Sequence, residues 1–161
     1  MQRYVQINAY ELKGIVLTGV AIGSDHAGYS LKCVILAHLQ EVGIELKDFG
    51  TFSDDRVDYP DYGALVGRAV ANGEFSSGIV VCGSGIGIVM AAGKIPGIRA
   101  ATIHDVTSAR LAREHNDANV IGLGARLVGE QIALDAVDAY LGAVFLGGRH
   151  ADRVKKLNLL D

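Results

Sequence analysis

The fold of this chain is limited most by a regular alternation of short apolar runs with longer segments of helical spacing. Five short runs have the length of strands, at residues 19–23, 44–50, 78–82, 98–103 and 118–124. The third run, GIVVC, is continuously apolar and β-branched, which is typical of strands buried on both faces of a parallel sheet.

Helical patterns lie between and after these runs, at residues 29–43, 64–73, 87–93, 106–115, 129–141 and 151–160. In the first of them Leu31, Ile35 and Leu39 share one face, and Gly43 marks the end. Five strand–helix alternations with short connections are typical of right-handed βαβ units. The chain is therefore predicted to form a Rossmann-like α/β fold of three layers, in which an open, parallel, five-stranded sheet carries helices on both faces.

The length of 161 residues suits one domain. We expect residues 1–17 to be an extension, either a short strand or arm or an unstructured leader, and residues 18–161 to form a single domain. The N-terminus lacks a secretion signal and no apolar run reaches the ~18 residues of a membrane span. Neither Cys33 nor Cys82 belongs to a C-x-x-C pair, which favours a reducing compartment. These features predict a cytoplasmic protein.

Charge and composition restrict the class of partner. A formal net charge of −3 gives no sign of a nucleic-acid-binding face and argues against an anionic membrane. Aromatic residues make up 6% of the chain and Trp is absent, so a stacking platform for bases is not expected. We expect neither a nucleic-acid nor a membrane partner.

Polar and reactive residues follow the predicted strands at the ends where open parallel sheets bind ligands. In chain order they are Ser24, Asp25, His26, Cys82, His104, Asp105, Gly122, Gly124 and Arg126. Polar residues also follow buried strands without any functional role. Because these come from separate segments and meet at one sheet edge, we predict a functional site there.

The loop after Cys82 reads GSGIG and leads into a predicted helix. It is not a dinucleotide-binding fingerprint, because Ile88 stands where that pattern needs glycine. Ile88 and Ile95 also exclude a P-loop, and a cysteine phosphatase would carry arginine at position 88. Two interpretations remain. The loop is either a cradle of backbone N–H groups for a phosphate or an oxyanion, or a tight turn in which the glycines only pack.

Cys82 is the candidate reactive group beside this loop. A free cysteine is often a small buried apolar residue. The N-terminal end of a helix, however, favours the thiolate, which suits a base or a nucleophile. Cys33 lies inside a predicted helix with no such feature and is interpreted as structural.

Two further groups of residues indicate chemistry. His115 and Asn116 lie where a predicted helix ends, and the imidazole can either cap that helix or act as an acid or base. Arg149 and Arg153 are four residues apart and share a helix face. Arginines in a first helical turn oppose the helix dipole, which indicates an anion between them, although a solvated basic tail is the alternative.

Five motifs occur in order along nearly the whole chain. They are GSDHAG (23–28), VDYPDYG (57–63), GIVVCGSGIGI (78–88), REHNDANVIGLGAR (113–126) and GGRHADRV (147–154). Together they resemble the ribose-5-phosphate isomerase B family, which also contains the galactose-6-phosphate isomerase subunits and allose-6-phosphate isomerase. The resemblance runs from about Val20 to Val154.

The resemblance implies that Cys82 is the base that moves a proton between C1 and C2 of the open-chain sugar, and that His115 opens the furanose ring. Ser84, where many relatives carry Thr, is the third implied catalytic residue. The arginines are implied to clamp the phosphate. The implied substrate-binding residues are Asp25, His26, Tyr59, Gly83, Ser84, Gly85, Ile86, Gly87, Asn116, Arg126, Arg149 and Arg153.

The implied reaction interconverts ribose 5-phosphate and ribulose 5-phosphate through an enediolate, with no cofactor and no metal ion. Another phosphorylated sugar is the nearest alternative: allose 6-phosphate, galactose 6-phosphate or a tetrose phosphate. A non-catalytic anion-binding module and a thiol-based phosphatase or transferase are further alternatives. The resemblance also implies a homodimer or homotetramer with shared active sites, in which His115 or the arginines serve the Cys82 of a neighbouring chain.

Overall fold

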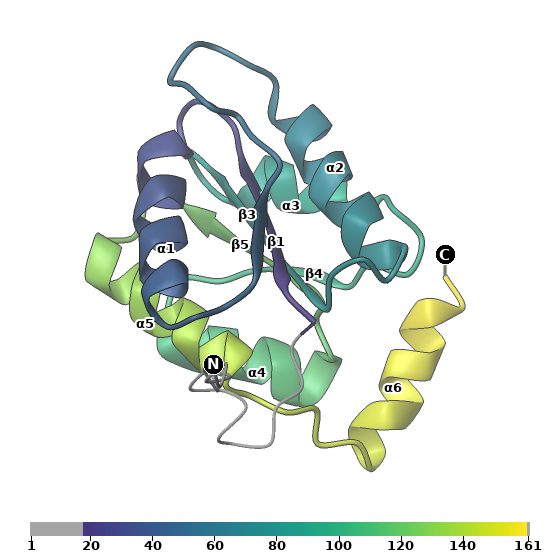
Figure 1. Cartoon of the computed structure of the whole chain (residues 1–161). Coiled ribbons are helices and arrows are strands. Elements are labelled where there is room, and N and C mark those ends of the chain that lie inside the picture. Colours follow the sequence, from purple (N-terminus) through teal and green to yellow (C-terminus); the bar gives the residue numbers. More distant parts are fainter. Residues whose placement is uncertain (1–17, 161) are drawn as a thin grey trace, which may run out of the picture.

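The computed structural model describes residues 18–160, so the expected extension at residues 1–17 lies outside the described residues. Five parallel strands form one sheet in the order β2-β1-β3-β5-β4 (Figure 1). The strands are β1 Val20–Ser24, β2 Leu46–Asp48, β3 Ser77–Cys82, β4 Ala100–Thr102 and β5 Val120–Gly124. The predicted α/β fold with a five-stranded parallel sheet is confirmed.

Strand β3 lies at the centre of the sheet and every one of its residues is buried. It pairs with β1 on one side and β5 on the other, with Val81 opposite Ser24 and Cys82 opposite Gly124. Because this register aligns the last residues of three strands, the loops that follow β1, β3 and β5 begin side by side at one edge of the sheet.

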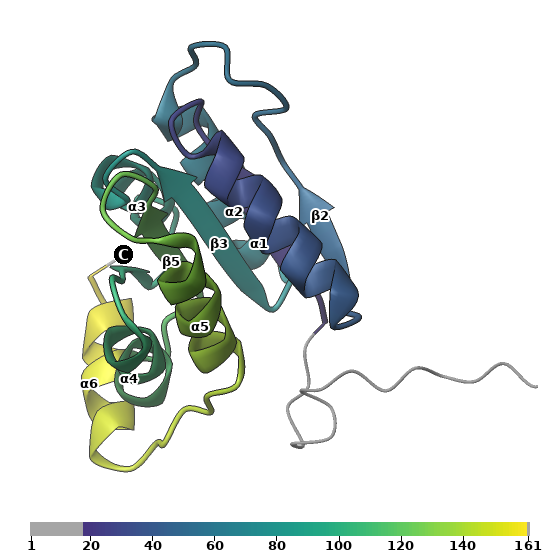
Figure 2. The ribbon, with the colours of Figure 1, turned by 90° about the vertical axis from the view of Figure 1, so that its left-hand side faces the viewer.

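Helices cover both faces of the sheet, as predicted. They are α1 Tyr29–Glu41, α2 Tyr59–Ala71, α3 Ile86–Gly93, α4 Val106–Asn116, α5 Glu130–Leu141 and α6 Arg149–Asn158. Helices α1 and α5 lie side by side in front of the sheet in Figure 2, with α4 next to α5, whereas α2 and α3 pack together on the other face. Helix α6 packs against α4. No helix within residues 18–160 combines the length and apolar character that a membrane span requires.

The alternating side chains of the strands build two cores. Val20 and Ile22 of β1 belong to the core under α1, α4 and α5, whereas Ala21 belongs to the core under α2 and α3. On β3 the same alternation places Val81 in the first core and Cys82 in the second. The side chain of Cys82 is therefore directed toward the α2–α3 face.

Helix α2 begins earlier than predicted. Residues 59–63 were expected to belong to the polar connection, yet the helix starts at Tyr59 with Asp58 as its N-cap residue and Pro60 in the first turn. Proline is compatible with a first helical turn because the amides there have no partner within the helix. The early start brings Tyr59 to the edge of the sheet where the strands end.

Gly28, at the start of α1, lies against the backbone of β3. A Cβ atom at this position would be 2.4 Å from the carbonyl oxygen of Val81 and 2.9 Å from the amide nitrogen of Cys82. Gly93, at the end of α3, is different, because its Cβ would meet only the Cβ of Ala100 at 3.7 Å.

The variant Gly28→Ala is expected to lower the free energy of unfolding by about 1–3 kcal/mol, because neither backbone atom can move aside. Gly93→Ala is the matched control, and it should leave stability unchanged or raise it. Urea denaturation of both variants checks this. Equal losses in the two would contradict the close approach of α1 to β3.

Candidate active site

A cavity of about 360 Å³ opens where β1, β3 and β5 end and α2 begins. Four segments contribute to its walls: the turn after β1, the first residue of α2, the glycine loop after β3 and the turn after β5. The lining residues are Asp25, His26, Ala27, Tyr59, Cys82, Gly83, Ser84, Gly87, Arg126 and Leu127. The predicted functional edge therefore carries a cavity, and seven of the twelve residues implied to bind substrate line it, together with Cys82.

Cys82 lines this cavity although it is only 4% exposed. Its Sγ accepts a hydrogen bond from the amide of Gly85 at 3.1 Å. Gly85 is the N-cap residue of α3 and has a φ of 74°, in the left-handed region that glycine adopts without strain. Cys82 thus borders the cavity, and its sulfur faces a backbone donor at a helix N-terminus.

The glycine loop is held between β5 and α2 by contacts that leave no room for side chains. A Cβ at Gly85 would lie 2.7 Å from the carbonyl carbon of Leu123, and a Cβ at Gly87 would lie 2.7 Å from Cζ of Tyr59. The amide of Arg126 also donates to the carbonyl of Gly83 at 3.0 Å. The glycines therefore do more than complete a turn, because they allow main chain, the Tyr59 ring and the guanidinium of Arg126 to meet at the cavity.

The turn after β1 presents Asp25 and His26. Asp25 is 6% exposed and its Oδ1 accepts a hydrogen bond from the amide of Gly28 at 3.0 Å. Nδ1 of His26 lies 3.1 Å from the carbonyl oxygen of Val57 and 3.3 Å from its amide nitrogen. In one tautomer Nδ1 donates to the carbonyl and in the other it accepts from the amide, so the segment before α2 fixes the orientation of the imidazole.

His115, Asn116, Arg149 and Arg153 do not line this cavity. A helix that connects parallel strands runs antiparallel to them, so α4 ends beside the amino ends of β4 and β5, at the opposite edge of the sheet. Helix α6, which carries both arginines, packs on α4. In Figure 1 α4 lies below the sheet and α6 at its lower right, whereas the loop that joins β2 to α2 is at the top.

The residues at this opposite edge form a cationic group. The rings of His115 and His150 are stacked, with centroids 4.2 Å apart and planes 8° from parallel. Burial lowers the pKa of His150, and the neighbouring charges of His115, Arg149 and Arg153 lower it further. The guanidinium groups of Arg149 and Arg153 beside the two stacked imidazoles make a favourable place for an anion.

Comparison with known proteins shows the family. The family model described as Ribose/Galactose Isomerase matches residues 20–157. The chain belongs to the ribose/galactose isomerase family. It is 49% identical over 142 residues to the ribose-5-phosphate isomerase B of Escherichia coli, covering 88% of this chain and 95% of that protein. It is also 39% identical over 146 residues to the D-erythrulose-4-phosphate isomerase of Pectobacterium atrosepticum, covering 90% and 96% of the two chains.

A solved structure agrees with this assignment. The ribose-5-phosphate isomerase B of Clostridium thermocellum superposes with a TM-score of 0.87 at 53% identity, over 88% of this chain and 96% of that one. The resemblance drawn from the motifs is thereby confirmed. This member of the ribose/galactose isomerase family is an aldose–ketose isomerase that acts on a phosphorylated sugar.

The sequence placed His104 and Asp105 at the functional edge, but they do not line the cavity of this family member. Asp105 caps α4: its side chain accepts from the amide of Ser108 at 2.8 Å, and this hydrogen bond lowers the pKa of the carboxyl. The pattern Asp-x-x-Ser resembles a capping box and could have identified this role. Leu127 lines the cavity but was not predicted to do so, because nothing in the sequence distinguishes an aliphatic residue of a cavity wall from any other aliphatic residue.

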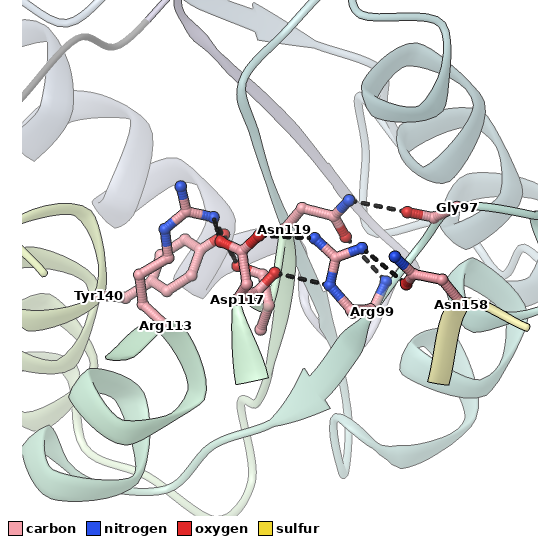
Figure 3. A network of polar contacts seen from close by, with 8 residues as sticks. Gly97, Arg99, Arg113, Asp117, Asn119, Tyr140 and Asn158 are labelled. Atoms are coloured by element: carbon pink, nitrogen blue, oxygen red, sulfur yellow. Dashed lines mark hydrogen bonds and ion pairs between the residues drawn. The ribbon is translucent and has the colours of Figure 1, made fainter. Parts of the chain in front are cut away.

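A polar network that sequence reasoning also missed joins the end of α4 to β4 and α6 (Figure 3). Asp117 receives ion pairs from Arg99 at 3.0 Å and from Arg113 at 2.8 Å. Arg99 also reaches Oδ1 of Asn158 on α6 at 3.2 Å. The network fixes α6 relative to α4 and so places the cationic group. Among residues 18–160, no cluster of His, Cys, Asp and Glu is arranged to hold a metal ion.

Proposed function

We propose that this chain interconverts ribose 5-phosphate and ribulose 5-phosphate through an enediolate, with Cys82 as the base. The observation that carries the proposal is the position of Cys82, which lines the cavity together with Asp25 and Arg126 and whose sulfur accepts a hydrogen bond from the amide of Gly85. The names of the Escherichia coli and Clostridium thermocellum relatives support this choice of sugar. The two unpaired cysteines fit a reaction in the cytoplasm.

Proton transfer follows from this geometry. The Cys82 thiolate removes the proton from C2 of the open-chain aldose, and the negative charge moves onto the oxygen of C1. Amide groups of the glycine loop stabilise that oxyanion. Cys82 then returns its proton to C1 while the hydroxyl of Ser84 relays the proton of O2 to O1, which completes the ketose. Ser84 is held for this step by a hydrogen bond from the amide of Ile86 to its Oγ at 3.3 Å.

The residues implied in ring opening and phosphate binding lie at the edge of the sheet opposite the cavity of their own chain. We therefore propose a homodimer, or a homotetramer built from it, in which His115, Asn116, Arg149 and Arg153 complete the cavity of the neighbouring chain. His115 would take the proton from the anomeric hydroxyl and protonate the ring oxygen as the ring opens. Arg126 and the neighbour's arginines would hold the phosphate.

An apolar surface beside the cavity supports this pairing. Ile86 and Met90 are 47% and 65% exposed, and they lie one turn apart on α3. Ile86 belongs to the glycine loop that follows Cys82 and is the first residue of α3. Two large apolar side chains at this position favour burial against a second copy of the chain, which would bring the neighbour's residues next to the loop.

The variant Cys82→Ala is expected to lower kcat by about 10³-fold, because it removes the base. Binding of ribose 5-phosphate, measured by calorimetry, should change less than about threefold. Cys33→Ala is the matched control, because that thiol is exposed on α1, and it should keep full activity. Unchanged turnover in Cys82→Ala would leave an anion-binding module with an inert thiol as the better account.

Mixing two inactive variants tests the shared site. If each cavity takes Cys82 from one chain and His115 from the other, a heterodimer of Cys82→Ala and His115→Asn has one intact site and one site that lacks both groups. After subunit exchange the mixture should regain about a quarter of wild-type activity. A mixture as inactive as its components would show that both residues act in the same chain's site.

The identity of the sugar has one serious alternative, a tetrose phosphate, which the erythrulose-4-phosphate isomerase relative favours. We expect kcat/KM for ribose 5-phosphate to exceed that for erythrulose 4-phosphate and for the six-carbon allose 6-phosphate by about tenfold or more, because a cavity of fixed depth discriminates by chain length. Steady-state kinetics on the three sugars checks this. A higher kcat/KM for either of the others would replace ribose 5-phosphate as the substrate.

A further inference from the structure

We propose that Lys32, a buried ammonium on α1, is a positioning residue for the active site. In this proposal it anchors residues 49–58, here called the β2–α2 segment, so that His26 and Tyr59 face the cavity. The inference rests on the proposed function in so far as it assigns a kinetic effect, but its structural part concerns the free protein.

Lys32 is fully buried, at 0% exposure. Its Nζ lies 2.6 Å from each carboxylate oxygen of Asp48 and 2.7 Å from the carbonyl oxygen of Thr51. An ammonium has three N–H donors, and each has an acceptor here. A charge withdrawn completely from water is tolerated only with such complete pairing. The three bonds tie α1 to the end of β2 and to the first part of the β2–α2 segment.

Further hydrogen bonds connect the residues bound by Lys32 to the end of β1. The amide of Thr51 donates to the carbonyl of Ser24 at 2.7 Å, and the amide of Ser24 donates to the carbonyl of Gly50 at 2.6 Å. Asp48 also accepts from the amide of Gly50 at 2.8 Å. Ser24 immediately precedes Asp25 and His26. One hydrogen-bonded unit therefore connects the Lys32 ammonium to the turn that lines the cavity.

The other end of the β2–α2 segment reaches the cavity itself. The backbone of Val57 contacts Nδ1 of His26, and Tyr59 lies two residues further, against Gly87. Between these ends the segment is largely exposed. Phe52 is 71% exposed, and its ring centroid lies 5.3 Å from Nζ of Lys32, within range of a cation–π contact. Because residues 52–56 have little core contact of their own, this part of the segment depends on the anchors at its two ends for its position.

A purely stabilising ion pair is the alternative, and it makes a different prediction. Loss of such a pair would lower stability in the way that a core cavity does and would leave the His26 ring and the affinity for substrate unchanged. A positioning residue, in contrast, acts through His26 and Tyr59. Its loss must therefore change the environment of the imidazole and the KM.

The test compares Lys32→Met with Leu39→Ala, a core variant two turns further along α1 at a side chain that is also fully buried. In the substrate-free protein, Lys32→Met should shift the imidazole ¹⁵N resonances of His26 and speed amide exchange in residues 52–57, whereas Leu39→Ala should do neither. With ribose 5-phosphate as substrate, KM should rise about tenfold and kcat should change less than about threefold.

Two further variants complete the test. Asp48→Asn keeps the size of the side chain and one acceptor oxygen, so it provides the same readouts if Lys32→Met does not fold. In a His26→Gln background, Lys32→Met should raise KM by a smaller factor than it does in the wild-type background, because only the path through Tyr59 remains.

Wild-type His26 resonances and wild-type exchange in Lys32→Met, or in Asp48→Asn where the first variant does not fold, would overturn the proposal. So would a KM no higher than that of Leu39→Ala. If the wild-type protein does not isomerise ribose 5-phosphate while the His26 resonances still shift, the proposed function fails and the positioning role stands.

Discussion

The structure depends on the approach of two stretches of main chain, the glycine loop after β3 and the last residues of β5. A Cβ at Gly124 would lie 2.6 Å from the backbone of Ser84, and one at Gly85 would lie 2.7 Å from the backbone of Leu123. Only glycine allows this distance. The approach fixes the direction of the Gly85 amide, and that amide in turn meets the sulfur of Cys82. The position of the Gly85 amide beside Cys82 thus depends on the lack of side chains at Gly85 and Gly124.

Much of this arrangement was predictable from the sequence, because it follows from strict rules of parallel sheets. The continuous apolar run of β3 identified a central strand, and the rule that ligands bind at the carboxyl ends of strands placed Asp25, Cys82 and Arg126 together. The early start of α2 was not predicted. Residues 57–63 are polar and contain a proline, a composition shared by loops and by first helical turns, and only the packing of Gly63 on α3 distinguishes them.

Hydrogen bonds and ion pairs between residues far apart in the sequence were also not predictable. No local pattern indicates that Lys32 would find Asp48 and Thr51, or that Asp117 would collect two arginines, because the partners come from separate elements. His115 shows the complementary limit. A role as acid or base was one of two predictions from its type and setting. Its position at the opposite edge of the sheet from Cys82 follows from the direction in which α4 runs, which only the assembled sheet reveals.

The cavity has a floor of main chain and walls of side chains, and these two parts are free to change independently. Within the floor, from Cys82 to Gly87, Gly85 and Gly87 are wedged between neighbouring elements and have no room for a side chain. Leu127 in the walls is 58% exposed, so its replacement disturbs little packing. A scaffold divided in this manner can acquire new sugar preferences during divergence while its main-chain floor stays intact.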